Sequence, residues 1–168
     1  VTYTCVDGDD IQMWVTYPPG FDPSRKYPVF LLLHGGPHNG IQDALTYRWN
    51  AHVFANWGYI VTWHNFHGSS GFGQAFADSI NPDRITLPYE DTIKAAEWLA
   101  AQPYVDADHM VAGGGSYGGF LATLTAWCER EQVAYQGVPV GTIKRFATGK
   151  GNADKEAMIA AARARGFN

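Results

Sequence analysis

Gly114-Gly115-Ser116-Tyr117-Gly118 is the stretch of this sequence that decides the fold. An apolar segment, residues 109–112, runs into its glycines, and residues 120–130 continue from it with helical spacing. A serine in a glycine-flanked turn between a strand and a helix is typical of a nucleophile elbow. The glycines are needed because the turn is strained and neighbouring chains crowd it. A plain turn with a solvated serine is the alternative, but the flanking strand and helix favour the elbow.

The sequence before this turn alternates between strand and helix patterns. Residues 28–33 and 59–63 are continuous apolar runs, as in buried central strands. Residues 47–57 have helical spacing and end before Gly58, and residues 89–101 form a second helical pattern. Strands that alternate with helices at this spacing predict βαβ units and a parallel sheet.

Two β-rich segments at the N-terminus predict a hairpin. Residues 2–6 and 11–17 are joined by Asp7-Gly8-Asp9-Asp10, a typical turn sequence. The predicted fold class is therefore α/β, with a mostly parallel sheet flanked by helices and an antiparallel hairpin at its N-terminal edge. Residues 65–73 are rich in Gly and Ser and are expected to form a loop.

A second glycine turn, His34-Gly35-Gly36-Pro37, directly follows the first central strand. Its glycines allow backbone amides to point at a reacting group. We expect the N–H groups of Gly36 and Tyr117 to stabilise a developing oxyanion beside Ser116. Because loss of one such donor costs about 10²–10³ in rate, the pairing of the two loops is chemically meaningful. A plain tight turn is the alternative.

The composition is that of one folded domain. The 168 residues are 46% hydrophobic and 17% charged, unlike a disordered chain. No apolar run reaches the roughly 18 residues of a membrane span, and the N-terminus lacks a signal-peptide pattern. We therefore expect a soluble chain that does not contact a membrane, with the cytoplasm favoured. The sequence predicts no cofactor.

The cysteines and histidines do not form a metal-binding pattern. Cys5 and Cys128 are far apart, so neither a disulfide framework nor a zinc site is predicted. Four histidines fall in or beside the predicted loops: His34, His38, His64 and His67. No HExxH or carboxylate–histidine spacing supports a metal there. Hydrogen bonds that orient the turns are favoured over a catalytic base or a metal site.

Over residues 8–122 the chain resembles the catalytic domain of the prolyl oligopeptidase family, particularly its acylaminoacyl-peptidase and dipeptidyl-peptidase-like branches. The motifs that carry the resemblance are His34-Gly35-Gly36-Pro37-His38, Trp57-Gly58-Tyr59, Asn65-Phe66-His67-Gly68-Ser69-Ser70-Gly71-Phe72-Gly73, Glu90-Asp91, Tyr104-Val105-Asp106 and residues 114–119. It implies a partial α/β-hydrolase fold and peptidase- or esterase-type acyl transfer at Ser116, on a peptide or small ester. His67 departs from the pattern, since the family usually has arginine there, which puts substrate contacts in doubt more than the fold.

The expected partners of the serine do not follow it in this sequence. α/β-Hydrolases carry their triad in the order Ser, Asp or Glu, His. After Ser116 there is no histidine, and the only aspartate is Asp154. The resemblance implies that both partners come from two later strands, beyond residue 168. Because a serine hydroxyl without a base is a weak nucleophile, we expect weak or no activity unless the missing groups are supplied in trans.

The charge balance changes just after the elbow. Residues 1–119 carry 5 Lys/Arg and 12 Asp/Glu, a net charge of −7, whereas residues 120–168 carry 7 and 4, a net charge of +3. Residues 117–168, above all 137–145 and 149–155, resemble RuvC-like Holliday junction resolvases. We interpret the chain as a single domain of two parts, a hydrolase-like part (1–119) and a tail of different origin (120–168), joined as a chimera near residues 116–122.

The tail is basic without being a nuclease. RuvC-like enzymes need a carboxylate cluster for two metals, and the resemblance puts the acidic pair expected after this helix beyond residue 168. Four side chains are candidate phosphate contacts: Lys144, Arg145, Lys150 and Lys155. A basic face in isolation is more often simply solvated, so nucleic-acid binding is the less favoured interpretation. Residues 158–164 have the pattern of an amphipathic helix.

Two functional hypotheses follow. The first is a serine hydrolase fragment with an oxyanion hole and an incomplete triad. The second is a non-catalytic folded chimera whose basic tail at most binds nucleic acid. In either case a sheet without its later strands exposes an edge, which predicts a homo-oligomer. A tail strand over residues 138–143 that covers this edge is the alternative.

Overall fold

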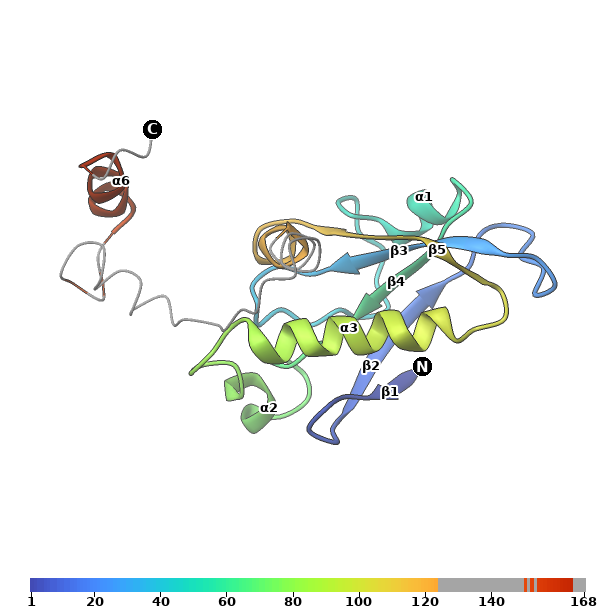
Figure 1. Cartoon of the computed structure of the whole chain (residues 1–168), viewed down its shortest axis with the longest axis horizontal. Helices are drawn as coiled ribbons and strands as arrows, with labels where there is room; N and C mark the ends of the chain where they lie inside the picture. Colours follow the sequence, from blue (N-terminus) through green and yellow to red (C-terminus); the bar gives the residue numbers. More distant parts are fainter. Residues whose placement is uncertain (124–149, 151, 153, 165–168) are drawn as a thin grey trace.

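The computed structural model of the chain describes residues 1–123, 150, 152 and 154–164 (Figure 1). Its strands are β1 (Thr2–Thr4), β2 (Asp10–Thr16), β3 (Tyr27–Leu33), β4 (Ile60–His64) and β5 (Val105–Gly114). Its helices are α1 (Ala51–Ala55), α2 (Gln74–Asp78), α3 (Thr86–Ala100) and α6 (Lys155–Ala164), and residues 117–123 are also helical.

The five strands form one mixed sheet in the order β1-β2-β4-β3-β5. β3 lies in the middle of the parallel part and pairs with β4 on one side and β5 on the other. β1 and β2 form an antiparallel hairpin, and β2 then pairs antiparallel with β4. The predicted α/β class, with a hairpin at the N-terminal edge of a parallel sheet, is confirmed.

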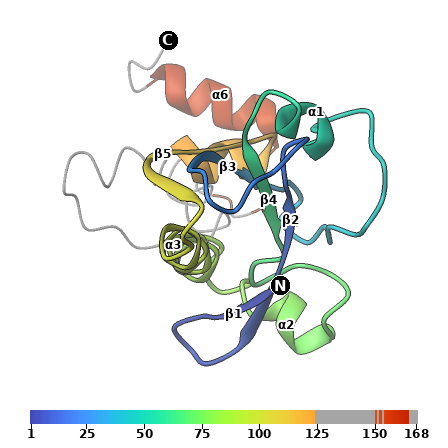
Figure 2. The same ribbon diagram turned by 90° about the vertical axis from the view of Figure 1, so that its right-hand side faces the viewer.

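Helices cover both faces of the sheet. Successive residues of β3 point to opposite faces, so this apolar strand offers each face side chains on which a helix can pack. Val29, Leu31 and Leu33 are buried in the larger core, which also contains Ala95 and Leu99 of α3. Leu32 packs on the other face in a smaller core with Ala55 of α1. Figure 2 shows α1 and α3 on opposite sides of the strands. The parallel register of β3 and β5, which pairs Leu33 with Gly114, sets the level at which both strands end.

The helix before β4 is shorter than the sequence predicts. Its pattern predicts helix over residues 47–57, but α1 begins at Ala51. Asn50 is the N-cap and its side chain accepts hydrogen bonds from the N–H groups of His52 and Val53. Trp49 has a left-handed φ of 52°, so a helix cannot run from residue 47 through Trp49 into α1. Tyr47, at the start of the predicted helix, is fully exposed. The short helix α2 was not predicted.

The tail is described in part. α6 contains the predicted helix over residues 158–164 and begins earlier, at Lys155. The predicted strand over 138–143, together with Lys144 and Arg145, lies outside the described residues, as does the predicted helix beyond residue 123. Within the part of the chain that the structure describes, no helix combines the length and the apolar character needed to cross a membrane.

Candidate active site

Ser116 lies in a sharp turn at the end of β5. The strand ends at Gly114, and residues 117–123 are helical, so the strand, turn and helix occur in the predicted order. Ser116 has a φ of 58°, a left-handed conformation that costs a residue with a Cβ about 1–2 kcal/mol. The residue is exposed. The turn therefore holds the hydroxyl out from the sheet at a conformational cost that the surrounding packing offsets.

Glycines make this turn possible because the neighbouring strand leaves no space for side chains. A Cβ on Gly114 or on Gly118 would overlap the carbonyl oxygen of Leu33, the last residue of β3. A Cβ on Gly119 would lie 2.8 Å from the carbonyl oxygen of Gly114. In each case the obstacle is backbone, which cannot rotate away as a side chain can. The glycine spacing is therefore a steric requirement of the turn.

The two glycine loops meet because β3 and β5 are parallel and in register. Leu33 pairs with Gly114, so both chains leave the sheet at the same level. A Cβ on Gly35 would lie 3.3 Å from the Cβ of Ser116 and 3.1 Å from the carbonyl oxygen of Gly115. Gly36, one peptide bond further, has a φ of 124°, which favours glycine. A side chain at position 35 would thus meet the serine, whereas one at position 36 would meet the backbone of residues 38 and 39.

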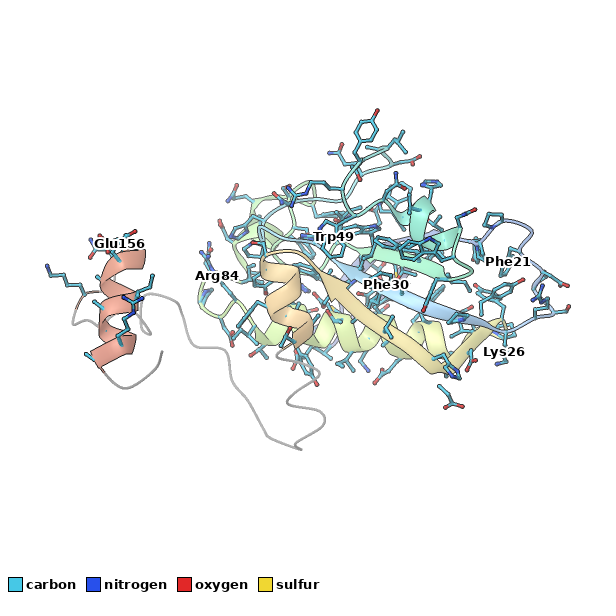
Figure 3. All side chains as sticks on the ribbon, turned by 90° about the horizontal axis from the view of Figure 1, so that it is seen from above. Phe21, Lys26, Phe30, Trp49, Arg84 and Glu156 are labelled. Carbon is cyan, nitrogen blue, oxygen red and sulfur yellow. The ribbon has the colours of Figure 1, made fainter. Side chains whose placement is uncertain are left out.

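A cleft of about 900 Å³ opens beside Ser116. Its walls come from β2, from the loop of residues 39–50 and from the two glycine turns. Trp49 (labelled in Figure 3) packs on the elbow, with its Nε1 3.0 Å from the position of a Cβ on Gly115. The indole Nε1–H of Trp14 donates to the carbonyl of Ile41 at 3.1 Å and ties the loop to the sheet. No motif in the sequence indicates that this loop lines the site.

All four predicted loop histidines make hydrogen bonds within the fold, and two of them join the loop after β3 to the loop after β4. His34 Nε2 lies 2.9 Å from Ser69 Oγ, and the ring stacks on Phe66. His38 Nδ1 lies 2.9 Å from the carbonyl oxygen of Gly68, so it joins the loop after β3 to the loop after β4. Burial lowers the pKa of His34 to about 4, which keeps its imidazole neutral at physiological pH.

His64, at the end of β4, is fully buried. Its Nε2 lies 3.2 Å from Thr92 Oγ1 on α3. Burial, followed by the charge of His34, lowers its pKa to about 3. Across the described residues no hydrogen bond joins Ser116 to any histidine. His34, His38 and His64 therefore hold neighbouring segments together and, within the described residues, make no hydrogen bond to the serine hydroxyl.

A sequence model of the prolyl oligopeptidase family matches residues 45–152. The chain belongs to the prolyl oligopeptidase family. The match contains the elbow, the loop after β4 and the Glu90-Asp91 pair of α3. It also continues through residues 116–122, where the sequence suggested a join, and nothing in the comparisons supports a resolvase-like tail or a chimera.

Two relatives of this member of the prolyl oligopeptidase family are named as dipeptidyl-peptidases. A probable dipeptidyl-peptidase 5 of Aspergillus terreus is 49% identical over 112 residues, which are 66% of this chain and 16% of that protein. Dipeptidyl-peptidase 5 of Porphyromonas gingivalis is 41% identical over 114 residues, 68% of this chain and 17% of that protein. The chain thus spans about one sixth of the length of these relatives.

The fold is also that of solved members of the class. The crystal structure of a putative dipeptidyl aminopeptidase IV from Bacteroides ovatus superposes with a TM-score of 0.71 at 29% identity, over 78% of this chain and 19% of that one. The predicted α/β-hydrolase-type sheet is therefore confirmed by similarity as well as by topology. The helices on both faces and the elbow at the end of β5 agree with it.

His67 stands where the family usually has arginine, a residue for which the resemblance leaves a structural or a substrate-facing role open. The exchange of arginine for histidine put substrate contacts in doubt, but His67 does not line the cleft. It is 1% exposed and lies under the hairpin turn, with Nδ1 2.9 Å from Asp91 Oδ2 and Nε2 3.1 Å from Asp7 Oδ2. Sequence reasoning missed this grouping because its members come from three distant segments, and their spacing matches no linear motif.

Proposed function

We propose that this chain carries the nucleophile-bearing part of a serine peptidase, with acyl transfer at Ser116. The observation that supports this most is the exposed Ser116 at a φ of 58°, beside a cleft of about 900 Å³. Membership of the prolyl oligopeptidase family supports the reaction class. The relatives named above are dipeptidyl-peptidases, so we propose peptide substrates, with small esters open to the same attack.

The chemistry assigned to the site is nucleophilic attack on an acyl carbon. Ser116 Oγ forms the new bond, the carbonyl π pair moves to oxygen, and the hydroxyl proton passes to a base. The N–H groups of Gly36 and Tyr117 stabilise the resulting oxyanion. Among the backbone hydrogen bonds of the described loops and turns, neither of these two N–H groups donates to a carbonyl oxygen. Both are therefore available to an oxyanion, which supports the assignment.

The proposed triad is incomplete in this chain. The sequence has no histidine after Ser116, and no described histidine is hydrogen bonded to its hydroxyl. A serine hydroxyl that lacks a base reacts slowly. An oxyanion hole with substrate binding alone retains about 10³–10⁴-fold catalysis over water. We therefore assign weak or no turnover to the chain alone, with the base and acid supplied in trans in any efficient reaction.

Covalent labelling with a fluorophosphonate tests the proposal. The serine oxygen forms a bond to phosphorus as fluoride leaves, so intact mass reports one adduct per chain. Wild type is expected to label slowly, because its serine lacks a base, and Ser116→Ala is expected not to label. Ser70→Ala is the matched control, because Ser70 lines the same cleft and its loss leaves labelling unchanged. A folded wild-type chain that does not label, or that labels equally in Ser116→Ala, contradicts the proposal.

We also propose that the outer edge of β5 associates with a second copy of the chain. Among the described residues β5 pairs only with β3, and Val111 on this strand is 51% exposed. A shallow groove of about 340 Å³ follows the same edge, lined by Ala112, Gly113, Gly114, Gly119, Ala122 and Thr123. Sedimentation is expected to show a homo-oligomer, and a monomer at high concentration contradicts this.

The alternative function is a non-catalytic single domain whose basic tail (120–168) binds nucleic acid. The change of net charge from −7 in residues 1–119 to +3 in residues 120–168 supports this alternative. Lys144 and Arg145 carry the test, because their joint replacement by alanine is expected to abolish any salt-dependent DNA binding. Absence of binding by the wild-type chain at about 50 mM salt removes this alternative.

A further inference from the structure

Metal-ligating side chains gather under the β1–β2 hairpin, away from the cleft. We call this group the hairpin cluster: Cys5, Asp7, Asp9, His67 and Asp91. Asp7 and Asp9 belong to the turn between β1 and β2, His67 to the loop after β4, and Asp91 to α3. The nearest ligand atoms of Asp7, Asp9 and His67 all lie within 4.8 Å of one another.

His67 is held so that one ring nitrogen faces the hairpin carboxylates. Asp91, which is fully buried, accepts hydrogen bonds from His67 N at 2.7 Å and from His67 Nδ1 at 2.9 Å. A carboxylate that accepts from one imidazole nitrogen fixes the tautomer with the lone pair on the other. Carboxylate, histidine and metal follow one another in this way in many metal sites. In the neutral ring the lone pair is then on Nε2, and a bound cation takes the place of the proton that Nε2 carries when the ring is charged.

His67 Nε2 has no hydrogen bond of good geometry, although its side chain is 2% exposed. It lies 3.1 Å from Asp7 Oδ2 and 3.5 Å from Asp9 Oδ2, close enough for attraction between charges. When the ring is charged these contacts are ion pairs, and a bound cation would replace the ring proton between the same oxygens. A buried nitrogen aimed between two carboxylate oxygens, without a directed hydrogen bond, is the arrangement that a shared cation satisfies.

The hairpin turn orients its carboxylates toward this point. Asp7 Oδ1 accepts from the Cys5 thiol at 2.5 Å and from Asp9 N at 3.1 Å, which leaves Oδ2 to face His67. Asp7 and Asp9 retain exposed side chains, 40% and 64%, so an ion can reach the site and keep water ligands. The cluster is thus open to solvent at Asp7 and Asp9 and buried at His67 and Asp91.

The donor set selects a class of ion. Imidazole nitrogen with carboxylate oxygens suits Zn²⁺ and its neighbours in the transition series, whereas Mg²⁺ and Ca²⁺ prefer oxygen alone. The thiol of Cys5 is close by and adds to this preference. We propose that Asp7, Asp9 and His67 bind one Zn²⁺-type ion that fastens the N-terminal hairpin to the loop after β4, with Asp91 as the positioning residue for His67.

Calorimetric titration of the metal-free chain with ZnCl₂ tests the proposal. We expect one site per chain, and an increase in Tm of about 5–10 °C at a Zn²⁺ concentration 100-fold above Kd. MgCl₂ and CaCl₂ at the same concentration are expected to leave Tm unchanged. His67→Ala is expected to abolish the site, and Asp9→Asn, on an exposed side chain that folding does not require, to weaken it at least about tenfold.

Two matched controls separate the site from general charge. Asp10→Asn removes a neighbouring carboxylate at the start of β2, and His109→Ala removes an exposed histidine paired with Asp106 on β5. Both are expected to bind Zn²⁺ as wild type does. Absence of Zn²⁺ binding by the folded wild-type chain overturns the proposal. So does unchanged binding in Asp9→Asn, or equal stabilisation by Mg²⁺.

Discussion

The elbow and the hairpin cluster are two sites built by opposite means. The elbow depends on backbone: Gly114 and Gly118 make way for the Leu33 carbonyl, and Ser116 adopts a left-handed φ. The hairpin cluster depends on side chains from three separate segments, and its central group, His67, is held by a buried carboxylate. One site is exposed at a cleft, whereas the other lies under a hairpin.

The difference determines how each site responds to change. A backbone-built turn tolerates almost no added atom at its glycines, but it does not depend on any charge. A side-chain cluster tolerates shape changes better and depends on its charges, because a buried charge that loses its partner is costly. The two regions are therefore distinguished by different substitutions.

Gly118→Ala is expected to have the largest effect. Its new Cβ meets the carbonyl of Leu33, which cannot move aside, so we expect a loss of about 3–5 kcal/mol in the free energy of unfolding. Gly20→Ala is the control, because it has a φ of 68° but no atom within 4 Å, and it is expected to cost about 1–2 kcal/mol. Urea denaturation measures both, and similar losses would show that crowding is not what requires glycine at 118.

Asp91→Asn is expected to have the next effect. It removes the buried charge facing His67, and we expect a loss of about 3 kcal/mol. Asp106→Asn removes the carboxylate of an exposed pair with His109 of the same type and is expected to change stability by no more than about 0.5 kcal/mol. If the two variants unfold at the same urea concentration, burial does not distinguish the hairpin cluster from an ordinary surface pair.

Much of the elbow and little of the hairpin cluster could be predicted from the sequence. Glycine spacing is a local signal, so the turn around Ser116 and its companion loop were visible, as was the α/β alternation. The helix start at Ala51 was missed because the left-handed Trp49 is set by packing on Gly115, a contact across the fold. His67 and Asp91 are 24 residues apart and meet only because α3 packs beside the loop after β4.

The pH dependence of stability tests His34, in the glycine loop beside the elbow. Burial lowers the pKa of His34 to about 4, so the folded state keeps it neutral while the unfolded state protonates near pH 6.5. Its contribution is fully present above pH 6.5 and is lost as the pH falls toward 4, by about 3 kcal/mol. His34→Asn is expected to lose less stability over this interval. Denaturation curves with the wild-type slope in this variant would contradict the assignment.

The most direct measurement of the central claim is a crystal structure of the chain after reaction with a fluorophosphonate. We expect phosphorus bonded to Ser116 Oγ, with a phosphoryl oxygen about 2.7–3.1 Å from the backbone nitrogens of Gly36 and Tyr117. An adduct on another residue, or a phosphoryl oxygen that faces away from both N–H groups, would contradict the account of this elbow as a nucleophile with its oxyanion hole.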